Sequence, residues 1–341
     1  MSSAFLALGP EERREALGYA AAATGRPPHL LEKDVMVVWA LAVLGASAYD
    51  EHLVFKGGTS LSKAYGAIAR FSEDIDLTYD IRAIASDLIA TGKEGLPASN
   101  NQQRAWTKQI RDRLQRWVET DVVPIFNRAI AADKLKAKTE VRDNATLVIE
   151  YAAVAEGTGY VEPRVRLEFG ARSTGEPAER REIVCDAAES LPELNFPTAR
   201  PRVMLAERTF WEKATAIHVF CKQGRFRGGE RFARHWYDLV RLDDAGIAAR
   251  ALADAPLAAE VARHKQIFFT EKDETGATID YAAAVTGALA LVPHGEALQR
   301  LATDYAKMVE DGLLLDEAAP FEELMARCAA LADRANASNA G

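Results

Sequence analysis

The chain has 341 residues, of which 48% are hydrophobic and 27% are charged, and its net charge is −8. This length predicts two domains of ordinary size with their own cores, and the composition fits a soluble globular protein. The acidic balance argues against a surface that is basic throughout and binds nucleic acid non-specifically, although it allows a local basic groove. The longest apolar stretch, VMVVWALAVLGASAY, is too short to cross a membrane and predicts a buried helix.

The three cysteines, Cys185, Cys221 and Cys328, are far apart in the sequence and lack the spacing of metal ligands. The N-terminal residues contain no apolar signal core. Both observations predict a cytoplasmic protein in a reducing environment.

The first hundred residues combine helical and strand patterns. Helical spacing predicts helices over residues 9–24 and 29–46, with prolines between them. HLVFKGG predicts a short strand that ends in a tight glycine turn, and TSLSKAYGAIA predicts a helix capped by Thr59 or Ser60. SEDIDLTYD alternates as a strand does, and residues 82–100 have the composition of a loop.

The remaining elements predict an α+β fold. A helix is expected over residues 101–133, and three strands follow within ATLVIEYAAV, PRVRLEFGA and EIVCDA. The proline-rich SLPELNFPTARPRV predicts a linker, and from about residue 203 the pattern is helical. We therefore expect a domain with a small mixed sheet flanked by helices over residues 1–195, including the N-terminal helices, and an all-helical domain over residues 196–341.

Two acids mark the strand near residue 75 as a candidate metal site. Asp74 and Asp76 are one residue apart, so their side chains project from the same face, opposite Ile75 and Leu77. Adjacent carboxylates repel each other unless a cation lies between them, and hard oxygen ligands of this kind suit Mg²⁺. The alternative is an ordinary strand end, because paired acids at this spacing are common.

A glycine pair precedes these acids. Gly57 and Gly58 allow the backbone to approach a ligand closely, and the helix start that follows offers N–H groups to a phosphate. Thr59 or Ser60 would add a hydroxyl. The spacing is not that of a P-loop. A phosphate-binding turn followed by a metal-binding pair is nevertheless what nucleotide chemistry requires.

The motif GGTSLSKAYGAIARFSEDIDL resembles the signature of polymerase-beta-like nucleotidyltransferases, with slightly longer spacing between the glycines and the acids. It more closely resembles the AbiEii/AbiGii family of toxins from abortive-infection and toxin–antitoxin systems. LLEKDVMVVWAL is similar to the upstream helix of that family, and ERTFWEKATAIH and RHWYDL are similar to its later motifs. The resemblance covers residues 30 to about 242, and its matching positions are residues 57–61, Arg70, Phe71, Ser72, Asp74 and Asp76, with Glu32, Lys33 and Asp34 upstream.

The resemblance implies roles for three further residues. Lys213 would neutralise the triphosphate or the departing pyrophosphate, and Asp238 would hold Lys213 or the nucleotide in place. Arg70 would be among the nucleotide-binding residues. Their sequence neighbours alone leave open a lysine that reaches to solvent and an acid on a helix surface.

Nucleotidyl transfer often uses a third carboxylate from a neighbouring strand. Glu168 in VRLEFGAR is the best-placed candidate for a third metal ligand, because Val165, Leu167 and Phe169 face the other side of the strand. Glu150 is a weaker rival. The alternative is a solvated strand face on which Arg166 and Glu168 pair.

KQGRFRGGERFARH concentrates basic residues in an otherwise acidic chain. Its cations are a candidate clamp for the triphosphate or for an RNA backbone, and a solvated loop is the alternative. The basic side of the 101–133 helix, formed by Arg104, Lys108, Arg111, Arg113 and Arg116, and Lys134, Lys136 and Lys138 would extend such a groove. The cations of the segment are Lys222, Arg225, Arg227, Arg231 and Arg234.

These observations predict a Mg²⁺-dependent enzyme that transfers a nucleoside monophosphate from an NTP to a hydroxyl group. The family resemblance implies transfer to RNA at the 3′ end of tRNA, a block of translation, and a cognate antitoxin protein as partner. Two alternatives remain open. One is a nucleotidyltransferase of the aminoglycoside-modifying type, and the other is a catalytically inactive nucleotide-binding protein.

Overall fold

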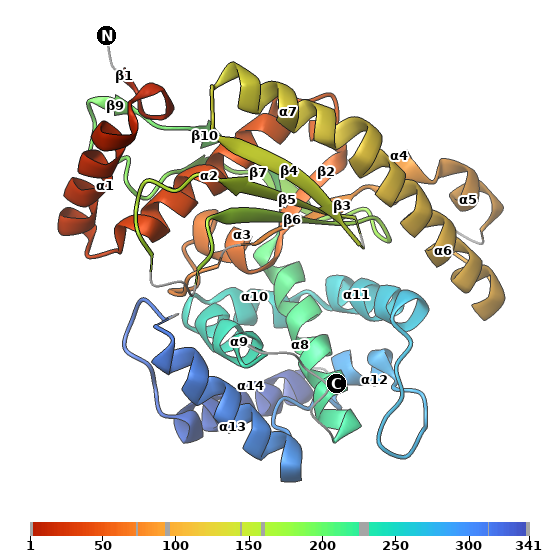
Figure 1. The fold of residues 1–341 in the computed structure, drawn as a ribbon. Helices are drawn as coiled ribbons and strands as arrows, with labels where there is room; N and C mark the ends of the chain where they lie inside the picture. The colour runs from red at the N-terminus through yellow and green to blue at the C-terminus, as the bar shows by residue number, and fades with distance from the viewer. Residues whose placement is uncertain are drawn as a thin grey trace. The chain divides into compact units, whose positions relative to one another are not determined.

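Figure 1 shows a computed structural model of the chain, which describes residues 3–72, 74–92, 96–143, 145–157, 161–224, 232–312 and 314–338. The chain forms two compact units. The first comprises residues 1–64, 72–96 and 104–204, and the second comprises residues 65–71, 97–103 and 205–341. The sequence predicts a boundary after residue 195, whereas the units divide after residue 204 and two short segments join the second unit.

A seven-stranded mixed sheet organises the first unit. Its strand order is β4-β5-β6-β3-β2-β11-β7. The central strands β3 and β6 run parallel to each other, and β2 pairs with β3 in the antiparallel direction. Burial alternates along β6, where Val165 and Leu167 are fully buried. The strands are β2 (Leu53–Lys56), β3 (Asp74–Tyr79), β4 (Ala137–Arg142), β5 (Thr146–Tyr151), β6 (Arg164–Gly170), β7 (Ala178–Arg180) and β11 (Arg202–Met204).

Helices and two small sheets surround this sheet. Trp117 at the end of α6 packs edge-on against Phe169 of β6, so the apolar face of β6 is covered by a helix. A π-helical turn (Val118–Val122) joins α6 to α7. The helices are α1 (Pro10–Thr24), α2 (Pro28–Gly45), α3 (Gly57–Lys63), α4 (Ile81–Ile84), α5 (Ser86–Thr91), α6 (Asn100–Trp117) and α7 (Val123–Ala132). The small sheets pair β1 (Ser3–Ala4) with β9 (Leu194–Asn195) and β8 (Ile183–Val184) with β10 (Thr198–Ala199).

The fold confirms the predicted α+β class and corrects several local predictions. α3 begins at Gly57 with Lys56 as its N-cap and ends at Lys63, so neither Thr59 nor Ser60 caps it. The predicted loop over residues 82–100 contains the end of α4 and all of α5. The predicted linker contains β9, β10 and the first two residues of β11, and β11 joins the main sheet beside β2. These short segments lack the length over which periodicity is informative.

The second unit is helical, as predicted, and apart from isolated bridges its described residues form no strand. α8 contributes Phe210, Trp211, Ala214 and Ile217 to the core, and all four are fully buried. Its helices are α8 (Ala206–Gln223), α9 (Arg234–Asp244), α10 (Ile247–Ala253), α11 (Ala255–Phe268), α12 (Tyr281–Val285), α13 (Gly295–Glu310) and α14 (Phe321–Ser338).

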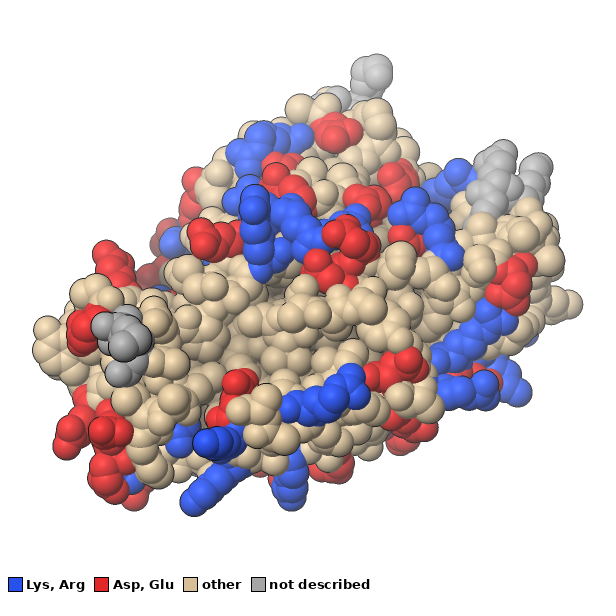
Figure 2. All heavy atoms as spheres, turned by 90° about the horizontal axis from the view of Figure 1, so that it is seen from above, with Lys and Arg blue, Asp and Glu red and all other residues tan. Residues whose placement is uncertain are grey.

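None of the helices described is both long and apolar enough to cross a membrane. On the face drawn in Figure 2, acidic and basic side chains are interspersed, and broad areas without charged residues lie between them. This face therefore agrees with the exclusion of a surface that is basic throughout.

Candidate active site

The sheet register brings the predicted carboxylates to one face of the first unit. Asp76 of β3 lies opposite Glu168 of the parallel strand β6 and opposite Lys56 of the antiparallel strand β2. Asp74, two residues earlier, lies opposite Arg166. Residues that oppose each other in register project from the same face, and so do residues two apart. The sheet register therefore brings Asp74, Asp76 and Glu168 to one face, together with Lys56 and Arg166.

Gly57 packs directly against one of these acids. Its φ angle is +81°, and a Cβ built at this position would lie 2.9 Å from Cγ of Asp76 and overlap its carboxylate. Both the backbone conformation and the lack of space therefore require glycine. The backbone at the start of α3 thus touches the side chain of Asp76. The close approach of this backbone to a ligand, which the sequence predicts, stays a prediction.

The two hydroxyl residues of the turn bond inward. The Thr59 hydroxyl donates to the carbonyl oxygen of Asp74, and the Ser60 hydroxyl donates to the carbonyl oxygen of Gly57 at 2.9 Å. Both side chains are buried, as is Gly58. Their hydroxyls therefore stabilise the turn through hydrogen bonds to the backbone. The sequence pattern predicts them as phosphate ligands because it cannot distinguish a hydroxyl that bonds within the protein from one that faces a ligand.

Arg166 lies among the carboxylates. Its Nε is 3.9 Å from Oδ1 of Asp74, and its guanidinium is 3.8 Å from Oε1 of Glu168, whose side chain is 46% exposed. Within the part of the chain that is described, no group of three or more His, Cys, Asp or Glu residues is arranged to hold a metal ion. Glu168 thus shares the face of Asp74 and Asp76 without forming a three-carboxylate cluster with them. Its rival Glu150 pairs with Lys138 of β4 at 2.7 Å.

A second cluster of predicted site residues lies inside the second unit. Both carboxylate oxygens of Asp238 accept hydrogen bonds from Arg70, at 2.6 and 2.8 Å. Nζ of Lys213 lies 2.8 Å from Oδ2 of the same carboxylate. Asp238 is 0% exposed, Arg70 4% and Lys213 8%. The cluster joins residues from α8, α9 and the segment before β3, and one carboxylate serves two cations.

The environment of Asp238 stabilises its ionised form. Burial alone would raise the pKa of Asp238, but the neighbouring Arg70 and Lys213 hold it well below its ordinary value of 3.8. Burial lowers the pKa of Lys213, and the positive charges of Arg70 and Arg234 act in the same direction, while Asp238 opposes them. The ammonium group of Lys213 therefore lies in a region where cations outnumber the acid it contacts.

The segment that carries Arg70 is fixed to the second unit by its backbone. The carbonyl oxygen of Ala69 accepts hydrogen bonds from the backbone N–H of Leu315 and from the Tyr237 hydroxyl, both at 2.9 Å. Arg70 itself also donates to the carbonyl oxygen of Phe71 at 3.2 Å. The motif that the sequence treats as one unit therefore contributes Arg70 to the second unit and Asp74 and Asp76 to the first.

The basic segment is described only in part. Lys222 is exposed on the last turn of α8, and Arg234 is partly buried at the start of α9. Arg225, Arg227 and Arg231 lie outside the described residues. On the basic side of α6, the side chain of Arg113 pairs with Asp87. The predicted phosphate clamp therefore stays a prediction.

Comparison with known proteins identifies a family. A family model described as the nucleotidyl transferase AbiEii toxin of type IV toxin–antitoxin systems matches residues 39–327. The chain matches no curated protein.

Two solved structures match this chain over most of their length. MenT4, a nucleotidyltransferase toxin from Mycobacterium tuberculosis H37Rv, is 17% identical with a TM-score of 0.38, and the match covers 92% of this chain and 98% of MenT4. A protein from H. pylori assigned as a nucleotidyltransferase is 15% identical with a TM-score of 0.42, and the match covers 90% of this chain and 93% of that protein.

Substitution of Gly57 by alanine should abolish most nucleotide transfer. The new methyl group would overlap the Asp76 carboxylate and displace it, and a misplacement of about 1 Å can cost ~100-fold in rate. Gly25→Ala is the matched control, because Gly25 also has a positive φ, of +72°, but has open space around its Cβ position. We expect both variants to lose stability and only Gly57→Ala to lose turnover, measured per folded molecule. Equal activity of the two variants would contradict the role of the Gly57–Asp76 contact.

Replacement of Asp238 by asparagine should destabilise the second unit by about 3–5 kcal/mol, because Arg70 and Lys213 would keep buried charges without their shared carboxylate. Asp244→Asn on the same helix is the control, since the Asp244 side chain is 39% exposed and its ion pairs contribute less than about 1 kcal/mol. Urea unfolding followed by tryptophan fluorescence measures both.

The effect of Asp238→Asn should depend on pH. The folded pKa of Asp238 is depressed, so its stabilisation is complete above the ordinary value of 3.8 and is lost as the pH falls below it. The difference in unfolding free energy between wild type and Asp238→Asn should therefore shrink in acid. A difference that grows as the pH falls would contradict the assignment of a charged Asp238.

Proposed function

The chain belongs to the AbiEii family of nucleotidyltransferase toxins of type IV toxin–antitoxin systems, and on this premise we propose that it transfers a nucleoside monophosphate from an NTP to a hydroxyl group of RNA. The proposed acceptor is the 3′ end of tRNA, whose modification would block translation. A cognate antitoxin protein is the proposed partner. The observation that carries the proposal is the shared face of Asp74 and Asp76 with the backbone of Gly57 packed against the second acid.

The donor set on this face fits Mg²⁺. Asp74 and Asp76 supply two carboxylates on adjacent positions of one face, and Mg²⁺ is usually bound by one or two carboxylates together with water and substrate phosphates. We propose that these two residues hold the metal. Glu168, the third ligand that the sequence suggests, lies opposite Asp76 on the neighbouring strand but does not form a three-carboxylate site with them. When bound there, Mg²⁺ would lower the pKa of the acceptor hydroxyl and neutralise charge on the triphosphate.

Arg166 and Lys56 have a supporting role in this proposal. They share the face of the carboxylates, and Arg166 approaches both Asp74 and Glu168 at less than 4 Å. Their positive charges reduce the repulsion between the acids in the absence of a ligand. Gly57 supports the same arrangement, because the absence of a side chain at this position allows the Asp76 carboxylate to lie against its backbone.

We propose that Lys213 stabilises the negative charge of the nucleotide phosphates or of the departing pyrophosphate. Its counter-charge, Asp238, is shared with Arg70, which takes both carboxylate oxygens. Part of the positive charge of Lys213 therefore remains available to an anion, and a preorganised cation of this kind stabilises charge that develops during transfer. Arg70 would act by holding Asp238 in place, since it donates to both carboxylate oxygens of Asp238 and to the Phe71 carbonyl oxygen.

The proposal predicts that the purified protein, incubated with total RNA, Mg²⁺ and each labelled NTP in turn, labels RNA. Asp76→Asn should reduce labelling by about a thousandfold, because metal binding contributes several kcal/mol to catalysis. Asp80→Asn is the matched control: Asp80 directly follows β3, but its carboxylate caps α4 and bonds Arg82. Equal labelling by wild type and Asp76→Asn would contradict the proposal.

The acceptor hydroxyl is tested in the same assay. Periodate oxidation destroys the vicinal diol at the 3′ end of RNA and leaves internal hydroxyls intact. RNA treated in this way should no longer accept label from the wild type. Labelling that persists would place the acceptor elsewhere on RNA, and transfer to an aminoglycoside in place of RNA would replace the proposed substrate class.

A further inference from the structure

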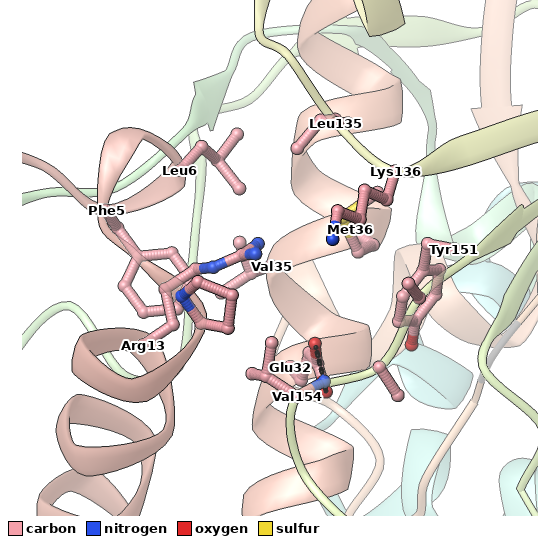
Figure 3. Close-up of a pocket in the computed structure, with 13 residues that line it drawn as sticks. Phe5, Leu6, Arg13, Glu32, Val35, Met36, Leu135, Lys136, Tyr151 and Val154 are labelled. Atoms are coloured by element: carbon pink, nitrogen blue, oxygen red, sulfur yellow. Dashed lines mark hydrogen bonds between the residues drawn. The ribbon is translucent and has the colours of Figure 1, made fainter.

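Three consecutive polar residues of α2 are buried. Glu32, Lys33 and Asp34 are 6%, 2% and 7% exposed, and each contacts a different part of the first unit. The Glu32 carboxylate accepts hydrogen bonds from the N–H groups of Val154 and Ala155, at the wall of a cavity of about 160 Å³ (Figure 3). Nζ of Lys33 donates to the carbonyl oxygen of residue 162 at 3.1 Å. Buried ionisable groups are costly unless they are paired, so these contacts constrain the fold.

Asp34 contacts the helix that carries the glycine pair. Its Oδ1 lies 2.6 Å from Nζ of Lys63, and its Oδ2 accepts a hydrogen bond of 2.6 Å from the backbone N–H of Asp186. Lys63 also pairs with the Asp186 carboxylate at 2.6 Å, and that carboxylate pairs with Arg26. Two acids and two bases thus form a balanced network around Lys63, and the side chains of Asp34 and Lys63 are both less than 10% exposed.

Lys63 is the last residue of α3, which starts with Gly57. α3 has only seven residues, begins with two glycines and has no side-chain N-cap. A helix this short is unstable without tertiary contacts. Side-chain bonds fix it at two points: the Thr59 hydroxyl bonds the Asp74 carbonyl oxygen near its start, and Lys63 bonds Asp34 and Asp186 at its end.

We infer that Asp34 and Lys63 are positioning residues for the nucleotidyltransferase site. Their ion pair holds α3 so that the backbone of Gly57 stays against the carboxylate of Asp76. The inference rests on the proposed function, because it assigns the Asp76 face as the place where Mg²⁺ and the NTP bind. Outer partners that orient a metal ligand commonly change metal affinity or activity by about 10–100-fold when they are lost.

A double-mutant cycle tests the inference. Lys63→Met, Asp34→Asn and the double variant are titrated with α,β-methylene-ATP and its GTP, CTP and UTP counterparts in the presence of Mg²⁺ by isothermal calorimetry, and their melting temperatures are recorded. Each single variant should bind the analogue that the wild type prefers at least about tenfold more weakly. The double variant should bind the analogue no more weakly than the single variant with the lower affinity, because both substitutions break the same ion pair.

Two further variants separate positioning from general stability. Lys63→Arg keeps the positive charge and should retain most of the affinity. Glu32→Gln is the matched control, because Glu32 lies on the same helix with similar burial but bonds the chain at Val154 and Ala155. It should lower the melting temperature and leave analogue affinity within about twofold of wild type, as expected for a purely structural contact.

The outcomes are distinct. Wild-type affinity in folded Lys63→Met, or in the charge-balanced double variant if the single variant does not fold, would overturn the positioning role and leave the proposed function intact. Failure of the wild type itself to bind any analogue with Mg²⁺ would overturn the proposed function and the positioning role with it. A loss of affinity in Glu32→Gln equal to that in Lys63→Met would also overturn the inference, because it would show a general effect of α2.

Discussion

The contact between the Gly57 backbone and the Asp76 carboxylate is the constraint on which the candidate site depends. It requires a positive φ and the absence of a side chain at residue 57. As a consequence, α3 starts with two glycines, which lowers its stability. Such a helix needs external support, which comes from Thr59 toward β3 and from Lys63 toward α2. Sheet register completes the arrangement by placing Asp74, Asp76 and Glu168 on one face. The local cost at Gly57 is thus met by contacts that are distant in sequence.

Much of this arrangement follows from the sequence, and the reasons are local. The shared face of Asp74 and Asp76 follows from the two-residue period of a strand, and the strand–turn–helix order follows from glycine and hydrophobic patterning. The cap of α3 was not predictable in this way, because Thr59 and Ser60 have the residue types of caps but bond inward. β11 was missed because three residues between prolines and loops give no period, although pairing with β2 makes them a strand.

The buried ion pairs lie beyond sequence reasoning for a different reason. Asp34 and Lys63 are separated by 29 positions, and Arg70 and Asp238 by 168, so their partners are set by tertiary packing alone. A lysine at the end of a short helix or an acid between apolar neighbours is typical of a solvated surface. The family resemblance singles out Lys213 and Asp238, but it does not predict that Arg70 occupies both carboxylate oxygens of Asp238.

The buried clusters around Lys63 and around Lys213 differ in their balance of positive and negative charge, and this difference suggests different roles. Around Lys63, the carboxylates of Asp34 and Asp186 face the cations Lys63 and Arg26, so the network is balanced within the first unit. Lys213, in contrast, shares the single carboxylate of Asp238 with Arg70, and its pKa is lowered by burial and by the positive charges of Arg70 and Arg234. A buried cation with a shared counter-charge is costly to maintain, and an anion that approaches it recovers part of that cost. The first cluster is therefore suited to hold α3 in place, and the charge balance of the second supports the proposal that Lys213 stabilises a phosphate.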